Sequence, residues 1–127
     1  MGIMFDSKEF PLIKIELNKN LNNYDEFKNN LLDKWLELYE KKEYFELEFE
    51  TKNLNYVNPI YSFYMAVFIR KIKKQKPQYL QKSKIYIYNR YIFRLAKLIF
   101  EIEKPVAQVE LILIKDNIEI NKELVLP

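Results

Sequence analysis

The stretch FETKNLNYVNPIYSFYMAVFIRKIKK (residues 49–74) joins two different periodicities across a short loop. Its first residues finish a run in which apolar and acidic side chains alternate, which predicts a strand over residues 45–49 with one face in water. Beyond the loop, apolar side chains recur at helical spacing over residues 61–72, so we expect a helix that stops before Pro77. The loop therefore connects a predicted strand to a predicted helix.

This loop, Asn-Tyr-Val-Asn-Pro, has two interpretations. Asn58 suits an N-cap, because its side chain can accept a hydrogen bond from a free backbone N–H, and Pro59 suits the first helical position. A cap can also form a docking surface, so both interpretations can hold. We predict a protein-binding site in this loop and at the start of the helix, made of Tyr56, Asn58, Pro59, Tyr61 and Ser62.

Strand and helix periodicities alternate along the rest of the 127 residues. The predicted strands are residues 3–5, 12–17, 45–49, 85–88 and 106–114, followed by a turn at 115–117 and a candidate edge strand at 118–120; the predicted helices are residues 23–42, 59–76 and 89–104. The order β-β-α-β-α-β-α-β is typical of an α/β protein with a mixed sheet whose apolar face is covered by helices. We expect residues 1–127 to form a single domain.

The composition excludes several classes of enzyme. One glycine, at position 2, is too few for a P-loop or a dinucleotide-binding loop. The absence of cysteine and histidine removes disulfides, thiolate nucleophiles, Ser-His-Asp catalysis and zinc sites built from Cys and His. The glutamates at 46, 48 and 50 alternate with apolar residues and indicate a solvent-facing strand surface. We expect no catalytic residue, no cofactor and no metal.

The sequence also suggests where the protein acts. No signal peptide is visible, and the longest apolar runs are about half of the ~20 residues that a membrane-spanning helix needs. A cytoplasmic location is therefore the expectation. The heavy use of Lys, Asn, Ile, Tyr and Phe indicates an AT-rich genome, such as that of a virus, a parasite or a low-GC bacterium.

Residues 24–72 combine three features: an amphipathic segment ending WLELYE, a strand FELEFETKNLNYVN and a helix that opens where this strand ends. In this combination they resemble the STAS domain, the fold of bacterial anti-sigma-factor antagonists and their relatives. The resemblance implies a STAS-like mixed sheet over most of the chain. It also implies a regulatory protein without enzymatic activity, which binds a partner kinase or phosphatase and is switched by a hydroxyl at the helix start.

This chain departs from the STAS pattern at the switch itself. The family places a phosphorylatable Ser or Thr directly after an Asp or Asn, whereas here Asn58 is followed by Pro59 and Ile60. Ser62 and Tyr61 are the nearest hydroxyls, one turn further into the helix. A phosphate near a helix N-terminus is stabilised by free N–H groups and the helix dipole, so Ser62 is the candidate phosphorylation site.

Charge is distributed unevenly along the chain. Residues 51–100 contain eleven basic and no acidic residues, whereas the rest contains ten basic and eighteen acidic ones. This split predicts an acidic protein partner, or a homodimer in which basic and acidic regions meet. The alternative is a nucleic-acid-associated accessory protein of a virus or mobile element that uses the basic segment 70–97. Its binding residues would be Arg70, Lys71, Lys73, Lys74, Lys76, Lys82, Lys84, Arg90 and Arg94.

Overall fold

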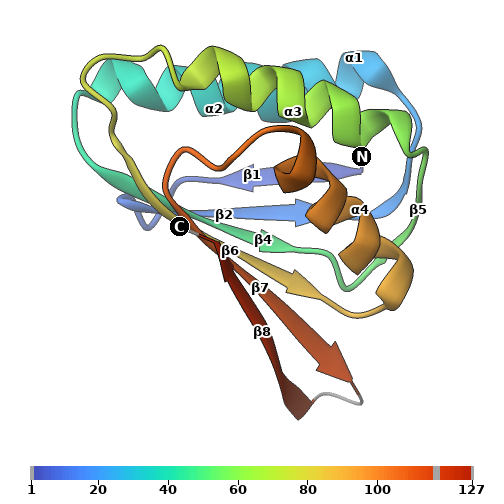
Figure 1. The fold of residues 1–127 in the computed structure, drawn as a ribbon. Coiled ribbons are helices and arrows are strands. Elements are labelled where there is room, and N and C mark those ends of the chain that lie inside the picture. Colours follow the sequence, from blue (N-terminus) through green and yellow to red (C-terminus); the bar gives the residue numbers. More distant parts are fainter. Residues whose placement is uncertain (1, 116–117, 127) are drawn as a thin grey trace.

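The computed structural model of the protein describes residues 2–115 and 118–126, and most of its strands form a six-stranded sheet in the order β1-β2-β4-β6-β7-β8 (Figure 1). These strands are β1 (Ile3–Asp6), β2 (Leu12–Leu17), β4 (Phe45–Glu50), β6 (Leu80–Ile87), β7 (Gln108–Lys115) and β8 (Ile118–Leu126). The four middle strands are parallel, and β1 and β8 pair antiparallel at the two edges. The predicted α/β class and mixed sheet are confirmed, and the expected turn at residues 116–117 lies outside the described residues.

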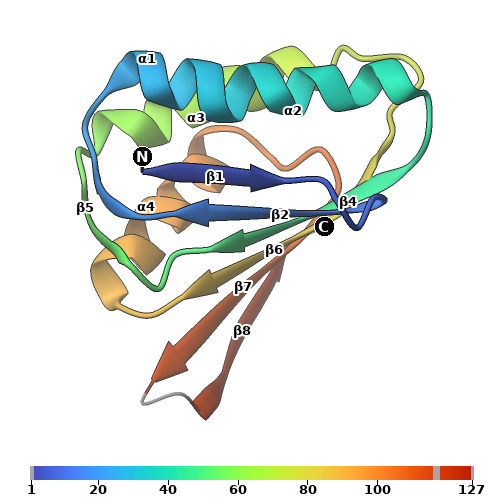
Figure 2. The ribbon, with the colours of Figure 1, turned by 180° about the vertical axis from the view of Figure 1, so that it is seen from behind.

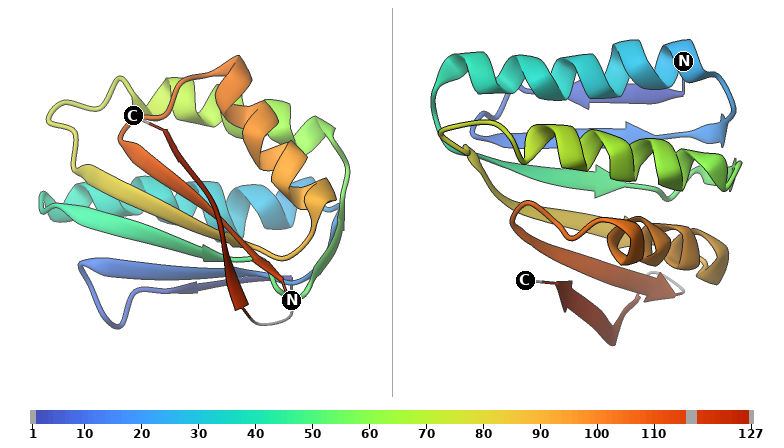
Figure 3. Two further views of the ribbon diagram at one scale, coloured as in Figure 1. Left: turned by 60° about the horizontal axis from the view of Figure 1, so that its bottom comes forward. Right: turned by 45° about the horizontal axis from the view of Figure 1, so that its top comes forward.

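Helices cover one face of this sheet and lie side by side (Figure 3). The first is continuous: α1 (Tyr24–Phe27), a π-helical turn (Lys28–Leu32), α2 (Asp33–Leu38) and a 3₁₀ turn (Tyr39–Lys41). The other two are α3 (Ile60–Ile72) and α4 (Arg90–Ile102). Each helix begins one residue after its predicted start, so the helical periodicities located all three correctly.

Asparagine side chains cap the first helix and α4. The Oδ1 atom of Asn23 accepts the N–H of Glu26 at 3.1 Å, and Oδ1 of Asn89 accepts the N–H of Ile92 at 2.9 Å. Asn23 and Glu26 have the spacing of a capping box, but the Glu26 carboxylate accepts the N–H of Gly2 at 3.1 Å. The start of the first helix is thereby tied to the strand β1 rather than closed on itself.

The core lies between the helices and the sheet. Phe45, Leu47 and Phe49 of β4 are buried there, whereas the glutamates between them point to the other face. Trp35 of α2 packs against Phe49 and against Phe68 of α3, with ring centroids 5.9 and 5.0 Å apart. The alternation predicted for residues 45–49 is therefore confirmed.

Two short strands were missed by the sequence analysis. β3 (Lys19–Leu21) and β5 (Leu54–Val57) form a separate parallel pair next to the main sheet. The loop predicted to contain Tyr56 is therefore shorter than expected, because Tyr56 and Val57 belong to β5. The strand β6 also begins at Leu80 rather than Ile85, since the buried position between Lys82 and Lys84 is held by the polar Ser83, which interrupts the apolar alternation.

The other face of the sheet carries no helix in the described chain (Figure 2), and charged side chains lie along its strands. The register places five charged residues of alternating sign side by side across five strands. This cross-strand row consists of Asp6, Lys14, Glu48, Lys84 and Glu110. Opposite charges directly across neighbouring strands attract, so the row supports the register of the sheet.

Candidate functional site

Asn58 caps α3, as the sequence predicts. Its Oδ1 atom accepts the backbone N–H of Ile60 at 3.0 Å, and its carbonyl oxygen accepts the N–H of Tyr61 at 3.0 Å. The carbonyl oxygen of Pro59 accepts the N–H of Ser62 in the same way. The first backbone N–H groups of the helix therefore have acceptors in Asn58 and Pro59. The side chains of Asn58 and Pro59 stay exposed.

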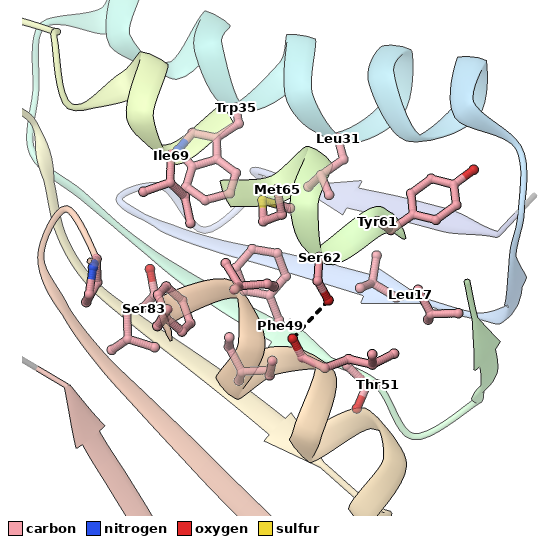
Figure 4. Close-up of a pocket in the computed structure, with 18 of the residues that line it drawn as sticks. Leu17, Leu31, Trp35, Phe49, Thr51, Tyr61, Ser62, Met65, Ile69 and Ser83 are labelled. Atoms are coloured by element: carbon pink, nitrogen blue, oxygen red, sulfur yellow. Dashed lines mark hydrogen bonds between the residues drawn. The ribbon is translucent and has the colours of Figure 1, made fainter. Parts of the chain in front are cut away.

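Ser62 and Tyr61 point inward. Ser62 is 3% exposed, and its Oγ donates a hydrogen bond to the carbonyl oxygen of Leu95 in α4 at 3.0 Å (Figure 4). Tyr61 is also buried; its ring lies 5.1 Å from that of Phe27, and burial raises its pKa. Burial counts against the prediction that both belong to a protein-binding surface, because Ser62 faces α4 and Tyr61 packs against Phe27 of the first helix. Phosphorylation of Ser62 stays a prediction, and the burial of its hydroxyl counts against it.

Two tyrosines fix the loop on the side of α4. The rings of Tyr56 and Tyr91 stack with an interplanar angle of 12° and centroids 6.1 Å apart. The Tyr91 hydroxyl donates a hydrogen bond to the carbonyl oxygen of Val57. Both rings nevertheless remain substantially exposed. Aromatic rings held in place but open to solvent lose little conformational entropy on binding, which suits a contact surface.

The outer face of α3 presents an apolar row that the sequence analysis missed. Ile60, Phe63 and Val67 are 44%, 49% and 63% exposed and follow one another at i, i+3 and i+7. The same face continues with Lys71 in the last turn of α3, and Lys74 follows in the turn just after the helix. We call Tyr56, Ile60, Phe63, Val67, Lys71 and Lys74 the α3 stripe.

The sequence does contain a signal for this stripe. The first two turns of α3 are apolar around the whole helix, with Ile60, Phe63 and Val67 lying off the face formed by Tyr61, Tyr64, Met65, Phe68, Ile69 and Ile72. A helix that is apolar all round is normally buried on all sides. In this two-layer fold α3 is covered by the sheet and its neighbours on one side only.

A groove borders the stripe where α3 meets the first helix. Its walls include Tyr24, Lys28 and Leu36 from the first helix and Tyr64 and Val67 from α3. The rings of Tyr24 and Tyr64 meet edge to face, with centroids 5.1 Å apart. Tyr24 is itself exposed, so the apolar surface extends from the stripe into this groove.

The basic residues predicted for nucleic-acid contact lie on both sides of the sheet. Near the end of α3, Glu103, the residue directly after α4, accepts hydrogen bonds from Lys73 Nζ at 2.6 Å and Arg70 Nε at 2.8 Å. These hydrogen bonds lower the pKa of the Glu103 carboxyl, and the bond from Lys73 has the larger effect. These contacts leave Lys71, Lys74 and Lys76 as the more open part of this group.

The remaining basic residues lie elsewhere. Lys82 and Lys84 belong to β6 on the helix-free face, where Lys82 Nζ lies 2.7 Å from a carboxylate oxygen of Glu110. Arg90 and Arg94 are exposed on α4. Of the nine residues predicted for nucleic-acid contact, seven therefore lie on α3, on the loop after it and on α4, and Lys82 and Lys84 lie on the far side of the sheet.

Other classes of site are not apparent in the described part of the chain. In residues 2–115 and 118–126, no group of three or more acidic side chains could hold a metal ion. Within the same ranges, none of the helices has the length and apolarity required to span a membrane. Comparison with protein-family models, with curated proteins and with solved structures gives no match to this chain.

Proposed function

We propose that this protein is a non-enzymatic regulatory module that binds a protein partner through the α3 stripe. The observation that carries the proposal is the exposure of Ile60, Phe63 and Val67 along one helix face. Exposed apolar side chains that adjoin one another, with polar groups around them, mark interaction surfaces. The loop alone predicted a binding surface that includes Tyr61 and Ser62. The surface proposed here is the exposed face of the same helix.

Burial of the exposed apolar side chains of the stripe would favour binding. Completing the burial of a half-exposed Ile, Phe or Val side chain contributes roughly 1 kcal/mol. Three such residues in a row, with a stacked tyrosine pair at one end, can therefore form the centre of an interface. Asn58 and the helix start hold this row in place without any partner, so little ordering is needed on binding.

The charges on the stripe indicate the chemistry of the partner. Its first half is apolar and its second half carries Lys71 and Lys74. A complementary surface would present apolar side chains followed by carboxylates, and the lysines would accelerate association. A second copy of this chain is one acidic candidate, because eighteen acidic residues lie outside the basic segment.

The resemblance to STAS domains agrees with this proposal. Members of that family bind regulatory protein partners at the corresponding helix start, although the hydroxyl of their switch is replaced here by Pro59. The proposal includes the cytoplasmic location expected from the sequence. It does not require phosphorylation of Ser62.

Nucleic-acid binding remains the alternative and can be tested separately. Charge reversal at Lys73 and Lys74 should abolish binding that depends on phosphate contacts, and should only slow association with a protein partner. Because Lys82 and Lys84 lie on the opposite side of the sheet from the other seven basic residues, this alternative has less support than the stripe gives the first.

The deciding experiment compares partner capture by three purified forms of the protein. These are the wild type, the double variant Phe63→Asp/Val67→Asp, and Met4→Asp as a matched control, because Met4 is 57% exposed on the edge strand β1. Captured proteins are identified by mass spectrometry, and their affinity is then measured with purified components. Sedimentation of each form alone tests for a homodimer.

We expect the wild type and Met4→Asp to bind the same partner, and the double variant to lose it while remaining folded by circular dichroism. Equal binding by all three forms would exclude the stripe as the interface. Loss of the captured material on nuclease treatment would favour the nucleic-acid alternative.

A further inference from the structure

A second feature lies inside the molecule, between the helix layer and the sheet. A cavity of about 130 Å³, partly open to solvent, is bounded by α3, α4, the first helix and the strands β4, β6 and β7 (Figure 4). Its position places the inner face of α3 on one side and the central strands of the sheet on the other. It is separate from the α3 stripe, which faces outward.

The wall of the cavity is almost entirely apolar. None of the residues that line it carries a charge. Two of its hydroxyls are already bonded to backbone carbonyl oxygens: Ser62 Oγ to Leu95 at 3.0 Å and Thr51 Oγ1 to Tyr86 at 2.7 Å. A buried water needs two to four polar partners, so this wall offers a poor site for water.

Side chains around the cavity are less buried than their positions predict. Ile85 lies on a central strand beneath the helices, between Phe49 and Leu111 in the register, yet it is only partly buried whereas both neighbours are buried. Leu95 and Ile99 of α4 line the same cavity and are also only partly buried. The helix α4 therefore stands off the sheet instead of closing onto it.

We propose that this cavity is a binding site for a neutral, hydrocarbon-like ligand, such as a single aromatic ring or a short branched acyl group. The volume sets the size, because an engineered cavity of about 150 Å³ lined by Leu, Ile and Phe stays dry and binds benzene. The wall sets the chemistry, since a buried ion without a partner is strongly unfavourable. Met65, with its flexible thioether, can adjust the wall to ligands of different shape.

The first test is titration of the wild-type protein with benzene, followed by methyl nuclear magnetic resonance. We expect saturable shifts at Ile85, Leu95 and Ile99 and none at the outer methyl groups of Val67. Benzoate, of similar size but charged, should leave all four unchanged. At about ten times its dissociation constant, benzene should also favour the folded state about elevenfold in thermal or urea unfolding.

The second test fills the cavity. Ala96 lines it from α4, so Ala96→Leu should remove the benzene response, whereas Lys97→Leu, one residue along on the exposed face, should retain it. Ala107→Leu fills the cavity from another segment and replaces Ala96→Leu if that variant fails to fold. The proposal is overturned if the wild type shows no saturable shifts, if benzoate binds equally well, or if a folded filling variant binds benzene as the wild type does.

Discussion

At the scale of single residues, Asn58 shows how one side chain sets both a boundary and a surface. Its Oδ1 and carbonyl oxygen accept the N–H groups of Ile60 and Tyr61, which ends β5 and begins α3 within three residues. Because the cap holds the first turn, it also fixes the direction in which Ile60 and Phe63 leave the helix. Asn58 therefore holds the start of the α3 stripe in position without being part of the stripe.

Replacing Asn58 should therefore cost stability. We expect Asn58→Ala to lower the free energy of unfolding by about 1 kcal/mol, because one helical N–H loses its acceptor. Asn58→Asp keeps the acceptor and should stay within a few tenths of a kcal/mol of the wild type. Urea denaturation at neutral pH measures both. Equal loss in the two variants would mean that the amide group, not the cap, is what matters.

Ser62 provides the second prediction at this scale. A carboxylate placed there would be buried against Leu95, so we expect Ser62→Glu to lower the free energy of unfolding by at least about 2 kcal/mol. Ser62→Ala only removes one hydrogen bond and should cost about 1 kcal/mol. Urea denaturation compares them. Similar stability of the two variants would show that Ser62 can turn outward, and would revive the phosphorylation hypothesis.

These two residues mark what the sequence could and could not predict about the site. The role of Asn58 follows from its immediate neighbours, so local pattern was sufficient. The burial of Ser62 depends on Leu95, which lies 33 positions further along the chain and belongs to another helix. No local pattern reports such a contact.

At the scale of elements, long periodic segments and the short strand β1 were located correctly, whereas β3, β5 and the first half of β6 were not. The helices and the strand β4 have clear periodicity and buried faces, and each lies where the sequence placed it. β3 has three residues and β5 four, too few for alternation to be recognised, and their pairing is non-local. The polar Ser83, at a buried position between two lysines, concealed the first half of β6.

Glu103 links two elements, because it joins the end of α4 to the end of α3 through Lys73 and Arg70. These partners lower its pKa from the ordinary value of 4.5, so the folded state holds the proton less tightly than the unfolded chain does. The ion pairs therefore stabilise the protein fully above the unfolded pKa. This contribution is lost as the pH falls through the lower, folded value.

We expect Glu103→Gln to be less stable than the wild type at pH 7, and the difference to shrink below about pH 4. Urea denaturation at several pH values measures it. Glu101→Gln, on an exposed position of the same helix, is the matched control and should change little. A difference that is constant with pH would show that the contacts of Glu103 act through packing rather than charge.

At the scale of the whole molecule, the sheet has one apolar face under the helices and one charged face. The two faces could be predicted from alternation in residues 45–50, but the order and register of the strands could not, since one sequence does not say which strands pair. The register is what turns separate charges, spread from Asp6 to Glu110, into a row of alternating sign.

The cross-strand row gives a test of the whole sheet, because Glu48 lies between Lys14 and Lys84 in it. Glu48→Lys would set three positive charges side by side, and we expect it to lower the free energy of unfolding by about 1 kcal/mol or more. Glu48→Gln only removes the attraction and should cost less. Added salt screens repulsion, so 0.5 M sodium chloride, with a Debye length of about 4 Å, should recover part of the loss in Glu48→Lys and little in Glu48→Gln.

Urea unfolding of both variants at low and high salt measures these effects, and Glu40→Lys, exposed in the 3₁₀ turn and away from the sheet, serves as the matched charge reversal. If Glu40→Lys and Glu48→Lys lose equal stability, the effect belongs to net charge and not to the row. If only Glu48→Lys loses stability and salt restores it, the charges across five strands act on one another directly. The register of the central sheet is then held from both faces, by packing under the helices and by charge on the open side.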